Sequence, residues 1–363
     1  MDDMQRQGAL ILLAVSVALA LQSHPLPPPT ANTAAAAAAP FLSAPSEGEG
    51  RWTREALAMD PRNRSAPWAP FGSPSFRPRF EDCGTEAFLR RHGGRGGSTS
   101  VVEALPFESL GFEGVRRGML STSRVERERD VMFIPQAVMM STQTAGRSYR
   151  GKLARFFVRA QHLPAAQQVE QTSLLALHVM HEALQRRSFW GPYLCSLPAA
   201  APQPFLWGRE AIRAACVTWA AAGVFRSQKI CAQSVDEKFE EYRGHYSDLR
   251  VAWRSATGTA LPGDYTLSAF VWAYGMVDSR SFGWKKDDGA PDVVMMPYAD
   301  MVNSREKGAG LLATFYESEH GVFGAAFRAM APADSQQELF LHYGDNHCHA
   351  TQYGFADAET KCN

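Results

Sequence analysis

The residues best suited to chemistry lie in two stretches of the C-terminal third, 271–303 and 338–355. Polar side chains there follow apolar runs, at points where a helix or strand is expected to end: Ser279, Arg280, Asp300, Asn303, Tyr343 and Tyr353. An arginine fork can bind a carboxylate through two hydrogen bonds, and a tyrosine hydroxyl can donate or accept one beside a reacting group. Such groups at the ends of rigid elements favour a binding or catalytic site.

The apolar spacing predicts the elements that position these side chains. A helix that ends near Arg280 is indicated by apolar residues at i, i+3, i+4 and i+7, which are Leu267, Phe270, Val271 and Tyr274. The run 293–296 predicts a short buried strand that ends at a proline. The stretch 338–343 predicts another strand, which ends in a glycine turn.

Composition limits the class of protein. The chain has 363 residues, 45% of them apolar, and 37 basic residues balance 37 acidic ones. Zero net charge argues against nucleic acid as the main partner. The six cysteines are scattered without a CxxC pair, so we predict free buried thiols rather than a zinc ribbon or a redox site.

Two groups of residues contain histidine or cysteine side chains of the kind that can ligate a metal. His178 and His181 lie at i and i+3 on a helix predicted over Ser173–Arg187, but no third ligand is suggested nearby, so we predict packed core histidines. A second group lacks close cysteine spacing and is predicted to be structural or surface: His342, His347, Cys348, His349 and Cys362. We therefore predict no metal.

The N-terminal hundred residues predict targeting and a linker. The apolar run 8–22 is shorter than the ~20 residues that span a bilayer, which favours a signal peptide or a signal anchor over 1–22. A soluble start is the alternative. Residues 23–100, rich in Pro, Ala and Gly, predict a disordered linker, and order is expected from Val101. Secretory entry, a plastid reached through a bipartite presequence, and the cytoplasm remain open as locations.

The order of motifs resembles the SET-domain protein methyltransferases of the RuBisCO large-subunit methyltransferase type. The matching pieces run from Val101 to Phe355: RDVMFIPQAVMMST, LLALHVMHEALQRRSFWGPYLCSLP, FLWGREAI, FVWAYGMVDSRSF, MMPYADMVNS, ELFLHYGDN and QYGF. The resemblance implies an α+β SET fold, with small β-sheets around a pseudoknot. It divides the chain into an N-terminal SET part over 101–170, a helical insert over 171–264 and a C-terminal SET part over 265–363.

The resemblance also implies an activity, namely transfer of a methyl group from S-adenosyl-L-methionine to a lysine of a protein substrate by a monomer. This in-line displacement depends on positioning rather than on a metal. Tyr343 would be catalytic, and Tyr353 and Phe355 would line the substrate channel. The cofactor-binding residues would be Ser279, Arg280, Asp300, Asn303, Ser304 and Gly118, with Asp300 paired to Arg280.

Departures from the family pattern keep other functions open. Ser304 replaces the histidine that usually follows the asparagine, and arginines 116 and 117 stand in the expected glycine-rich turn at 115–118. The chain ends at Asn363, where family members usually continue into a helical substrate-binding domain. The alternatives are a catalytically weak or inactive SET-like protein-binding module, a protein-histidine methyltransferase, and a secreted or membrane-tethered protein that uses the fold as a scaffold.

Overall fold

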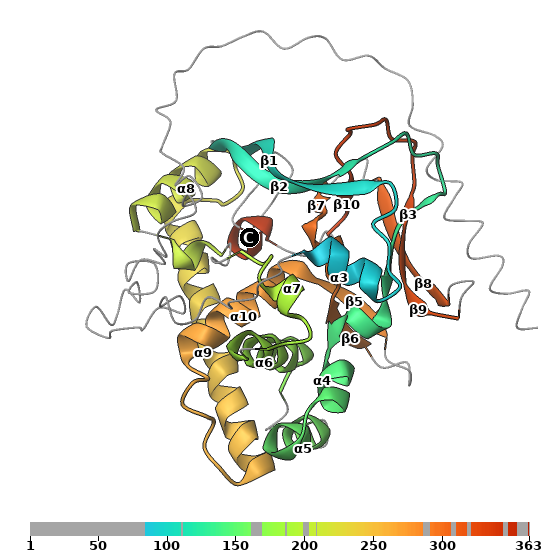
Figure 1. Ribbon diagram of the computed structural model, residues 1–363. Coiled ribbons are helices and arrows are strands. Elements are labelled where there is room, and N and C mark those ends of the chain that lie inside the picture. The colour runs from blue at the N-terminus through green and yellow to red at the C-terminus, as the bar shows by residue number, and fades with distance from the viewer. Residues whose placement is uncertain are drawn as a thin grey trace, which may run out of the picture. The chain divides into compact units, whose positions relative to one another are not determined.

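The computed structural model describes residues 84–109, 112–160, 169–185, 187–198, 203–207, 209–285, 291–305, 310–317, 321–343, 348–353 and 362 (Figure 1). These residues all lie within one compact unit, Ala38–Asn363. The predicted signal segment 1–22, Phe355 and His347 lie outside the described residues.

Within the described residues, the strands form four small sheets. The hairpin consists of β1 (Thr99–Ser109) and β2 (Phe112–Ser121), which pair antiparallel with Val102 opposite Gly118. One antiparallel sheet has the order β3 (Asp130–Pro135), β9 (Phe323–Ala329) and β8 (Leu311–Glu317). A second has the order β4 (Met140–Ser141), β6 (Pro291–Met295) and β5 (Ser281–Lys285). A parallel pair joins β7 (Asn303–Ser304) to β10 (Phe340–Leu341).

Helices provide most of the remaining structure. The α-helices are α3 (Thr85–Arg91), α4 (Thr142–Ser148), α5 (Gly151–Ala160), α6 (Gln171–Leu184), α7 (Gly191–Leu194), α8 (Arg209–Ala221), α9 (Gln228–Thr257), α10 (Leu267–Arg280) and α11 (His349–Tyr353). Short 3₁₀ turns are η1 (Gln136–Val138), η3 (Pro204–Leu206) and η4 (Ala299–Met301). Within the described ranges, none of these helices combines the length and apolar character needed to cross a membrane.

The core is built around α6 and α10, which pack against each other and against α9 (Figure 1). Every residue of α6 from Ser173 to Met180 is buried, and every residue of α10 from Ser268 to Val277 is buried. The sequence pattern predicted one apolar stripe on each helix. The helices are instead enclosed on all sides over these residues, which explains why both are apolar almost all round.

Ordered structure starts earlier than predicted. Helix α3 and the start of β1 lie in the range 23–100 that was expected to be a disordered linker. Phe88 and Leu89 of α3 are buried in the main core, and Arg95 forms a backbone bridge with Phe133 of β3. Burial of these apolar side chains supplies the stabilisation that the Gly-rich composition of the segment did not suggest.

The prediction of free thiols is wrong. Cys216 is bonded to Cys231, 15 residues away, and Cys348 to Cys362, 14 residues away, while Cys195 is also disulfide-bonded. All four cysteines of the first two bonds belong to or pack against a second small core around Trp219. Closing a loop of about 15 residues is worth roughly 3 kcal/mol in the chain-entropy model, so these bonds stabilise a region with few large apolar side chains.

Candidate active site

The turn between β6 and β7, together with β7 itself, carries three of the predicted site residues: Asp300, Asn303 and Ser304. Strand β6 ends at Met295, and η4 follows, held by a hydrogen bond from the Asp300 amide to the Met296 carbonyl (3.2 Å). Tyr298, which begins this turn, has φ 78 and ψ −45, a conformation that is rare for a residue with a side chain. Its hydroxyl donates to the Thr99 carbonyl (3.1 Å), so burial and a hydrogen bond hold the strained turn in place.

A buried ion pair forms the centre of the cluster. The Asp300 side chain has no exposed surface, and its Oδ2 accepts hydrogen bonds from Arg280 Nη1 (3.3 Å) and from the Tyr193 hydroxyl (2.9 Å). Arg280 Nη1 also donates to the Asp300 carbonyl (3.1 Å). The predicted Asp300–Arg280 pairing is therefore present. Burial raises the pKa of Asp300 above its usual value, and Arg280 and Tyr193 act in the opposite direction.

Arg117 joins this cluster from β2. Its Nη1 donates to the Ser196 carbonyl and lies 3.3 Å from Met301 Sδ, one residue past Asp300. The expected glycine-rich turn at 115–118 is wrong: these residues lie inside β2, where Gly118 is buried opposite Val102. The register of the hairpin shifts between Val102 and Leu105, opposite Arg117, and the Arg117 side chain lies beside η4.

Asn303 ties three segments together. Its Nδ2 donates to the Arg117 carbonyl (2.9 Å) and to Glu338 Oε1 (2.8 Å). Asn303 also pairs with Phe340 in the parallel β7–β10 ladder, and Ser304 pairs with Leu341. Both residues are half-buried. Both N–H groups of the asparagine amide are thus used by protein acceptors, so a ligand at this position would be left with the amide oxygen, the backbone of β7 and Ser304.

Tyr343 and Tyr353 lie side by side. The Tyr343 hydroxyl donates to the Val302 carbonyl (2.7 Å), and the two rings are 5.2 Å apart between centroids. Tyr343 follows β10, which is shorter than the predicted strand 338–343, and Tyr353 ends α11. Burial raises the pKa of Tyr353, and the neighbouring Tyr343 adds to the rise. The structure therefore brings the two predicted tyrosines together and joins them to the Asp300 turn through Val302.

Ser279 is less clearly part of the cluster. Its hydroxyl donates to the Gly275 carbonyl one turn earlier in α10 (2.7 Å), the usual use of a serine inside a helix. A ligand would have to compete with this bond. The role predicted for Ser279 in cofactor binding thus stays a prediction.

The Arg280–Asp300 pair retains hydrogen-bonding capacity. Arg280 Nε and Asp300 Oδ1 are buried and have no hydrogen-bond partner within the described part of the chain. Unsatisfied buried groups are uncommon in native proteins, and each calls for an explanation such as a ligand. Arg280 Nε is a donor, and Asp300 Oδ1 is an acceptor. Together they fit a ligand that carries both a carboxylate and a donor group such as an ammonium or hydroxyl.

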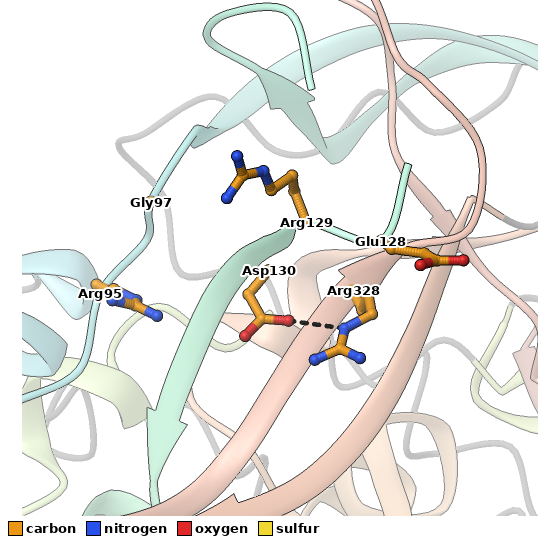
Figure 2. A pocket seen from close by; sticks show the side chains of 6 residues that line it. All are labelled: Arg95, Gly97, Glu128, Arg129, Asp130 and Arg328. Carbon is orange, nitrogen blue, oxygen red and sulfur yellow. Dashed lines mark hydrogen bonds and ion pairs between the residues drawn. The ribbon is translucent and has the colours of Figure 1, made fainter. Parts of the chain in front are cut away.

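A cavity of about 410 Å³ lies elsewhere in the fold (Figure 2). It opens at the start of β3 and is lined by Arg95, Gly97, Glu128, Arg129, Asp130 and Arg328. Arg280, Asn303 and Tyr343, between which the sequence motifs predict a cofactor pocket, do not line it.

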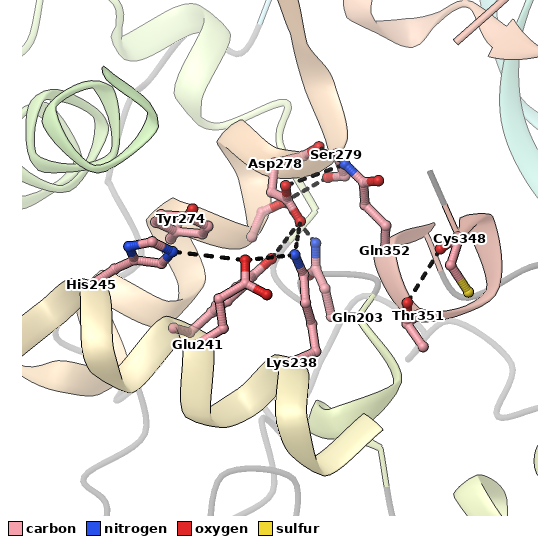
Figure 3. Close-up of polar contacts among 12 residues, drawn as sticks. Gln203, Lys238, Glu241, His245, Tyr274, Asp278, Ser279, Cys348, Thr351 and Gln352 are labelled. Atoms are coloured by element: carbon pink, nitrogen blue, oxygen red, sulfur yellow. Dashed lines mark hydrogen bonds and ion pairs between the residues drawn. The ribbon is translucent and has the colours of Figure 1, made fainter. Parts of the chain in front are cut away.

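A polar network supports the cluster from the side of the helical insert (Figure 3). Gln352 of α11 donates to the Asp278 carbonyl (2.8 Å) and to its Oδ1 (3.2 Å). Asp278 Oδ2 accepts from the Tyr242 hydroxyl (2.7 Å) and lies 3.8 Å from Lys238 Nζ, both on α9. Asp278 precedes Ser279 and Arg280, and Gln352 precedes Tyr353, so this network links the α10 end, α11 and α9.

Sequence reasoning missed several residues of this arrangement: Arg117 as a partner, Tyr193, Glu338, Asp278, Gln352 and the strained Tyr298. Five of them lie in the matching motif pieces of the sequence, namely Tyr193, Asp278, Tyr298, Glu338 and Gln352. Their partners come from segments far apart in the chain, so the contacts depend on the tertiary fold.

The helical histidines are structural in this fold. His178 is fully buried, and its Nδ1 shares a hydrogen bond with the Tyr149 hydroxyl, while His181 Nδ1 contacts the Tyr265 hydroxyl (2.5 Å). Burial lowers the pKa of His178 to about 3 and that of His181 to about 4. These contacts confirm the prediction of packed core histidines. Among the described residues, no group of three histidine, cysteine or acidic side chains is arranged to hold a metal.

Comparison with known proteins gives related sequences at low identity. No family model matches the chain. Actin-histidine N-methyltransferases of Rhinolophus ferrumequinum and Gallus gallus are each 24% identical over 250 residues, which is 69% of this chain and 38% of theirs. The protein of that name from Rattus norvegicus is 25% identical over the same length. The chain thus spans well under half the length of these relatives.

Solved structures give the fold. The SET domain of LSMT bound to MeLysine and AdoHcy superimposes with a TM-score of 0.52 at 14% identity, over 78% of this chain and 57% of that one. The SET domain of LSMT bound to Lysine and AdoHcy gives a TM-score of 0.50 at 16% identity, over 75% and 56%. Small sheets, an inserted helical part and these likenesses together show that the chain has an α+β, SET-like fold, as the motif order predicted.

Proposed function

We propose that this protein is an S-adenosyl-L-methionine-dependent protein N-methyltransferase. One observation carries the proposal. In a SET-like fold, the buried Arg280–Asp300–Tyr193 cluster and the Tyr343–Tyr353 pair meet at the same turn, Asp300–Val302. The Arg280–Asp300–Tyr193 cluster, the charged half of the site, provides an ion pair. The Tyr343–Tyr353 pair, the aromatic half, provides two neighbouring rings and a hydroxyl.

The residues present fit this cofactor. S-adenosyl-L-methionine supplies an electrophilic methyl group on a sulfonium, together with a carboxylate, an ammonium and ribose hydroxyls. The unsatisfied Arg280 Nε is suited to the carboxylate, and the unsatisfied Asp300 Oδ1 to an ammonium or a hydroxyl. Asn303 would act by holding β7 in place, since its amide is used by the Arg117 carbonyl and Glu338. Ser304 and the backbone of β7 would then contact the cofactor.

Tyr343 would position the acceptor nitrogen. Its hydroxyl is fixed by the Val302 carbonyl, so the ring is held in one orientation before any substrate arrives. The Tyr353 ring lies beside it, at 5.2 Å between centroids, and would narrow the space for the acceptor. An acceptor amine must be neutral and aligned to attack, and such positioning is worth up to ~7–11 kcal/mol of a barrier in favourable cases.

The proposal also includes the type of residue that accepts the methyl group. We place histidine first, because the relatives matched over 250 residues are named actin-histidine N-methyltransferases. Lysine, which the motif resemblance implies, is the second acceptor, and the LSMT structures that were compared hold lysine or methyl-lysine. A protein substrate, with the enzyme as a monomer, is common to both versions.

Labelled cofactor tests the activity and the acceptor together. The full chain is incubated with methyl-labelled S-adenosyl-L-methionine and a protein library, and mass spectrometry of digests locates the label on histidine or on lysine. Calorimetry measures cofactor binding in parallel. Arg280→Gln should weaken cofactor binding, and Tyr343→Phe should reduce methyl transfer with little change in binding. Absence of both binding and transfer would overturn the proposal.

Tyr246→Phe is a matched control for Tyr343→Phe. Tyr246 is also half-buried, and its hydroxyl donates to a backbone carbonyl, that of Tyr265, at 2.8 Å. It lies on α9, away from η4. Both variants lose the same kind of hydrogen bond, so only a loss specific to Tyr343→Phe supports a role in transfer.

A non-catalytic binding module is the second candidate. It is favoured by the internal use of the Asn303 amide and the Ser279 hydroxyl, and by the Arg117 side chain beside Met301, which all occupy positions expected to serve the cofactor. Such a module would bind a protein partner without binding S-adenosyl-L-methionine. Calorimetry separates the two candidates, because only the enzyme requires cofactor binding.

Entry into the secretory pathway is our proposal for location. The disulfides Cys216–Cys231 and Cys348–Cys362 support it, since structural disulfides persist in oxidising compartments and are rare in the cytosol. N-terminal sequencing of the mature protein, with mass spectrometry of thiols blocked before lysis, tests it. An uncleaved N-terminus together with reduced cysteines would contradict it.

A further inference from the structure

The cavity at the start of β3 is formed by side chains from three separate segments (Figure 2). Arg95 and Gly97 come from the link between α3 and β1. Glu128, Arg129 and Asp130 precede or begin β3, and Arg328 lies on β9. Its volume of about 410 Å³ is within the range of small-ligand sites. We call it the arginine cleft.

Backbone contacts fix the wall formed by the α3–β1 link. Arg95 exchanges hydrogen bonds with Phe133 of β3, at 3.0 Å from its N–H and 2.9 Å to its carbonyl. Gly97 has φ +55, and a Cβ there would collide with the Val131 carbonyl. Only glycine allows this close approach, so the first wall is held tightly against β3.

The opposite wall is equally fixed. Glu128 has φ 63, a left-handed conformation that is uncommon for a residue other than glycine, and its N–H donates to the Ala329 carbonyl (2.7 Å). The Ala329 N–H in turn donates to the Arg129 carbonyl (2.9 Å). Because Ala329 follows Arg328 on β9, these bonds set the distance between Arg129 and Arg328.

The charges in the arginine cleft do not balance. Asp130 Oδ1 accepts a hydrogen bond from Arg328 Nε at 3.0 Å, and this bond orients the Arg328 guanidinium. Within the described residues, Arg95 and Arg129 have no carboxylate within ion-pair distance. In Figure 2, the Arg129 side chain extends toward Gly97 and that of Arg95 toward Asp130, whereas the Glu128 carboxylate points away from both.

We infer that the arginine cleft binds a phosphate monoester dianion. The lining carries three guanidinium groups and two carboxylates. Asp130 pairs with Arg328, and Glu128 lies 3.8 Å from Arg127, so Arg95 and Arg129 are left without a carboxylate partner among the described residues. A phosphate monoester carries about −1.5 to −2 charges at pH 7 and has three acceptor oxygens. A single carboxylate would leave one arginine uncompensated. Guanidinium groups match phosphate oxygens in pairs. The backbone contacts of both walls fix the points from which the exposed Arg95 and Arg129 side chains extend.

The phosphate could belong to a small metabolite or to a phosphorylated side chain of a protein partner, and titration of the full chain separates these sources. Calorimetry at fixed ionic strength uses ribose 5-phosphate, a phosphoserine peptide and the unphosphorylated peptide as probes. Saturable one-to-one binding of either phosphorylated probe, with no heat from the plain peptide, is the expected result. Tighter binding of the phosphopeptide would assign the site to a protein partner, and tighter binding of ribose 5-phosphate to a metabolite.

Paired variants locate the binding. A double variant that carries both Arg95→Gln and Arg129→Gln should bind the phosphorylated probe at least tenfold more weakly than the wild type. Arg124→Gln is the control, because Arg124 is an exposed arginine on the same connection, pairs with Glu126 at 3.0 Å and does not line the cleft. Circular dichroism and the melting temperature of each variant confirm folding. The proposal is overturned if no phosphorylated probe binds the wild type saturably, or if the double variant binds as well as Arg124→Gln. Neither readout depends on methyl transfer.

Discussion

Removal of the Asp300 carboxylate should cost much more stability than removal of an exposed one. The Asp300 side chain is fully buried, and the Arg280 side chain is 18% exposed, so solvent screens their interaction little. Asp300→Ala leaves the guanidinium without its carboxylate and the Tyr193 hydroxyl without its acceptor. Breaking a buried pair on one side costs about 3–5 kcal/mol. We expect a loss of that size in the free energy of unfolding.

Asp300→Asn should cost less than Asp300→Ala. Burial is the largest influence on the pKa of Asp300 and raises it, which means that the charged form is held at a desolvation cost. An amide removes that cost and can still accept from Tyr193, so we expect roughly 1–3 kcal/mol. Tyr193→Phe, which deletes one hydrogen bond to a charged acceptor, should cost about 1.5–3 kcal/mol.

Urea denaturation followed by circular dichroism measures these losses by linear extrapolation. Glu86→Ala is the control, because Glu86 forms an exposed i,i+4 pair with Arg90 whose loss should cost only about 0.3–0.5 kcal/mol. Losses from Asp300→Ala and Tyr193→Phe should not add, since both act on the same oxygen. A loss below ~1 kcal/mol for Asp300→Ala, close to that of Glu86→Ala, would refute the reasoning that the pair is buried and structural.

Three further predictions address the tyrosine, the arginine cleft and acid stability. Tyr343→Phe removes a hydrogen bond to Val302, so unfolding in urea should show a loss of only about 0.5–1.5 kcal/mol, while methyl transfer falls sharply; an unchanged rate would remove Tyr343 from the mechanism. Gly97→Ala would place a Cβ on a residue with a left-handed φ and against the Val131 carbonyl. It should lower the free energy of unfolding by more than the ~1 kcal/mol expected when alanine only has to adopt a left-handed conformation. An equal or higher melting temperature would contradict the close approach to β3. Burial lowers the pKa of His178 to about 3. The unfolded chain therefore takes up a proton at this residue below about pH 6.5, while the folded chain does not, and stability should fall by a few kcal/mol between pH 6.5 and 3. A free energy of unfolding that does not change over this pH range would contradict a neutral buried ring.

The sequence predicted the elements whose signals are local. Helix α10 ends at Arg280, and β6 lies within two residues of the predicted strand. These follow from apolar periodicity and a proline, which act over a few residues. The Asp300–Arg280 pair spans 20 residues and was predicted from the family resemblance instead. The strand predicted over 338–343 was too long, because only Phe340–Leu341 forms a ladder, with the short parallel strand β7, while Glu338 makes an isolated bridge with Leu120.

What the sequence did not predict depends on long-range contacts. The pairing of Cys216 with Cys231 requires α8 and α9 to pack against each other, and no spacing rule indicates it. Likewise, α3 is ordered because Phe88 and Leu89 reach the main core, although the surrounding composition favours disorder. The strained Tyr298 has no local signal at all, because its conformation is held by a hydrogen bond to Thr99, 199 residues earlier.

The position of Asn303 changes how the site is understood. The motif order suggested an asparagine that contacts the cofactor directly, but its amide bonds to the Arg117 carbonyl on β2 and to Glu338 before β10. Those two bonds hold β7 between chain segments that lie 186 and 35 residues away. Asp300 and Val302, which contact Arg280 and Tyr343, lie directly before β7. Asn303 therefore fixes the relation between the charged half and the aromatic half of the site, and its replacement would act on both halves at once even if no ligand atom touches its side chain.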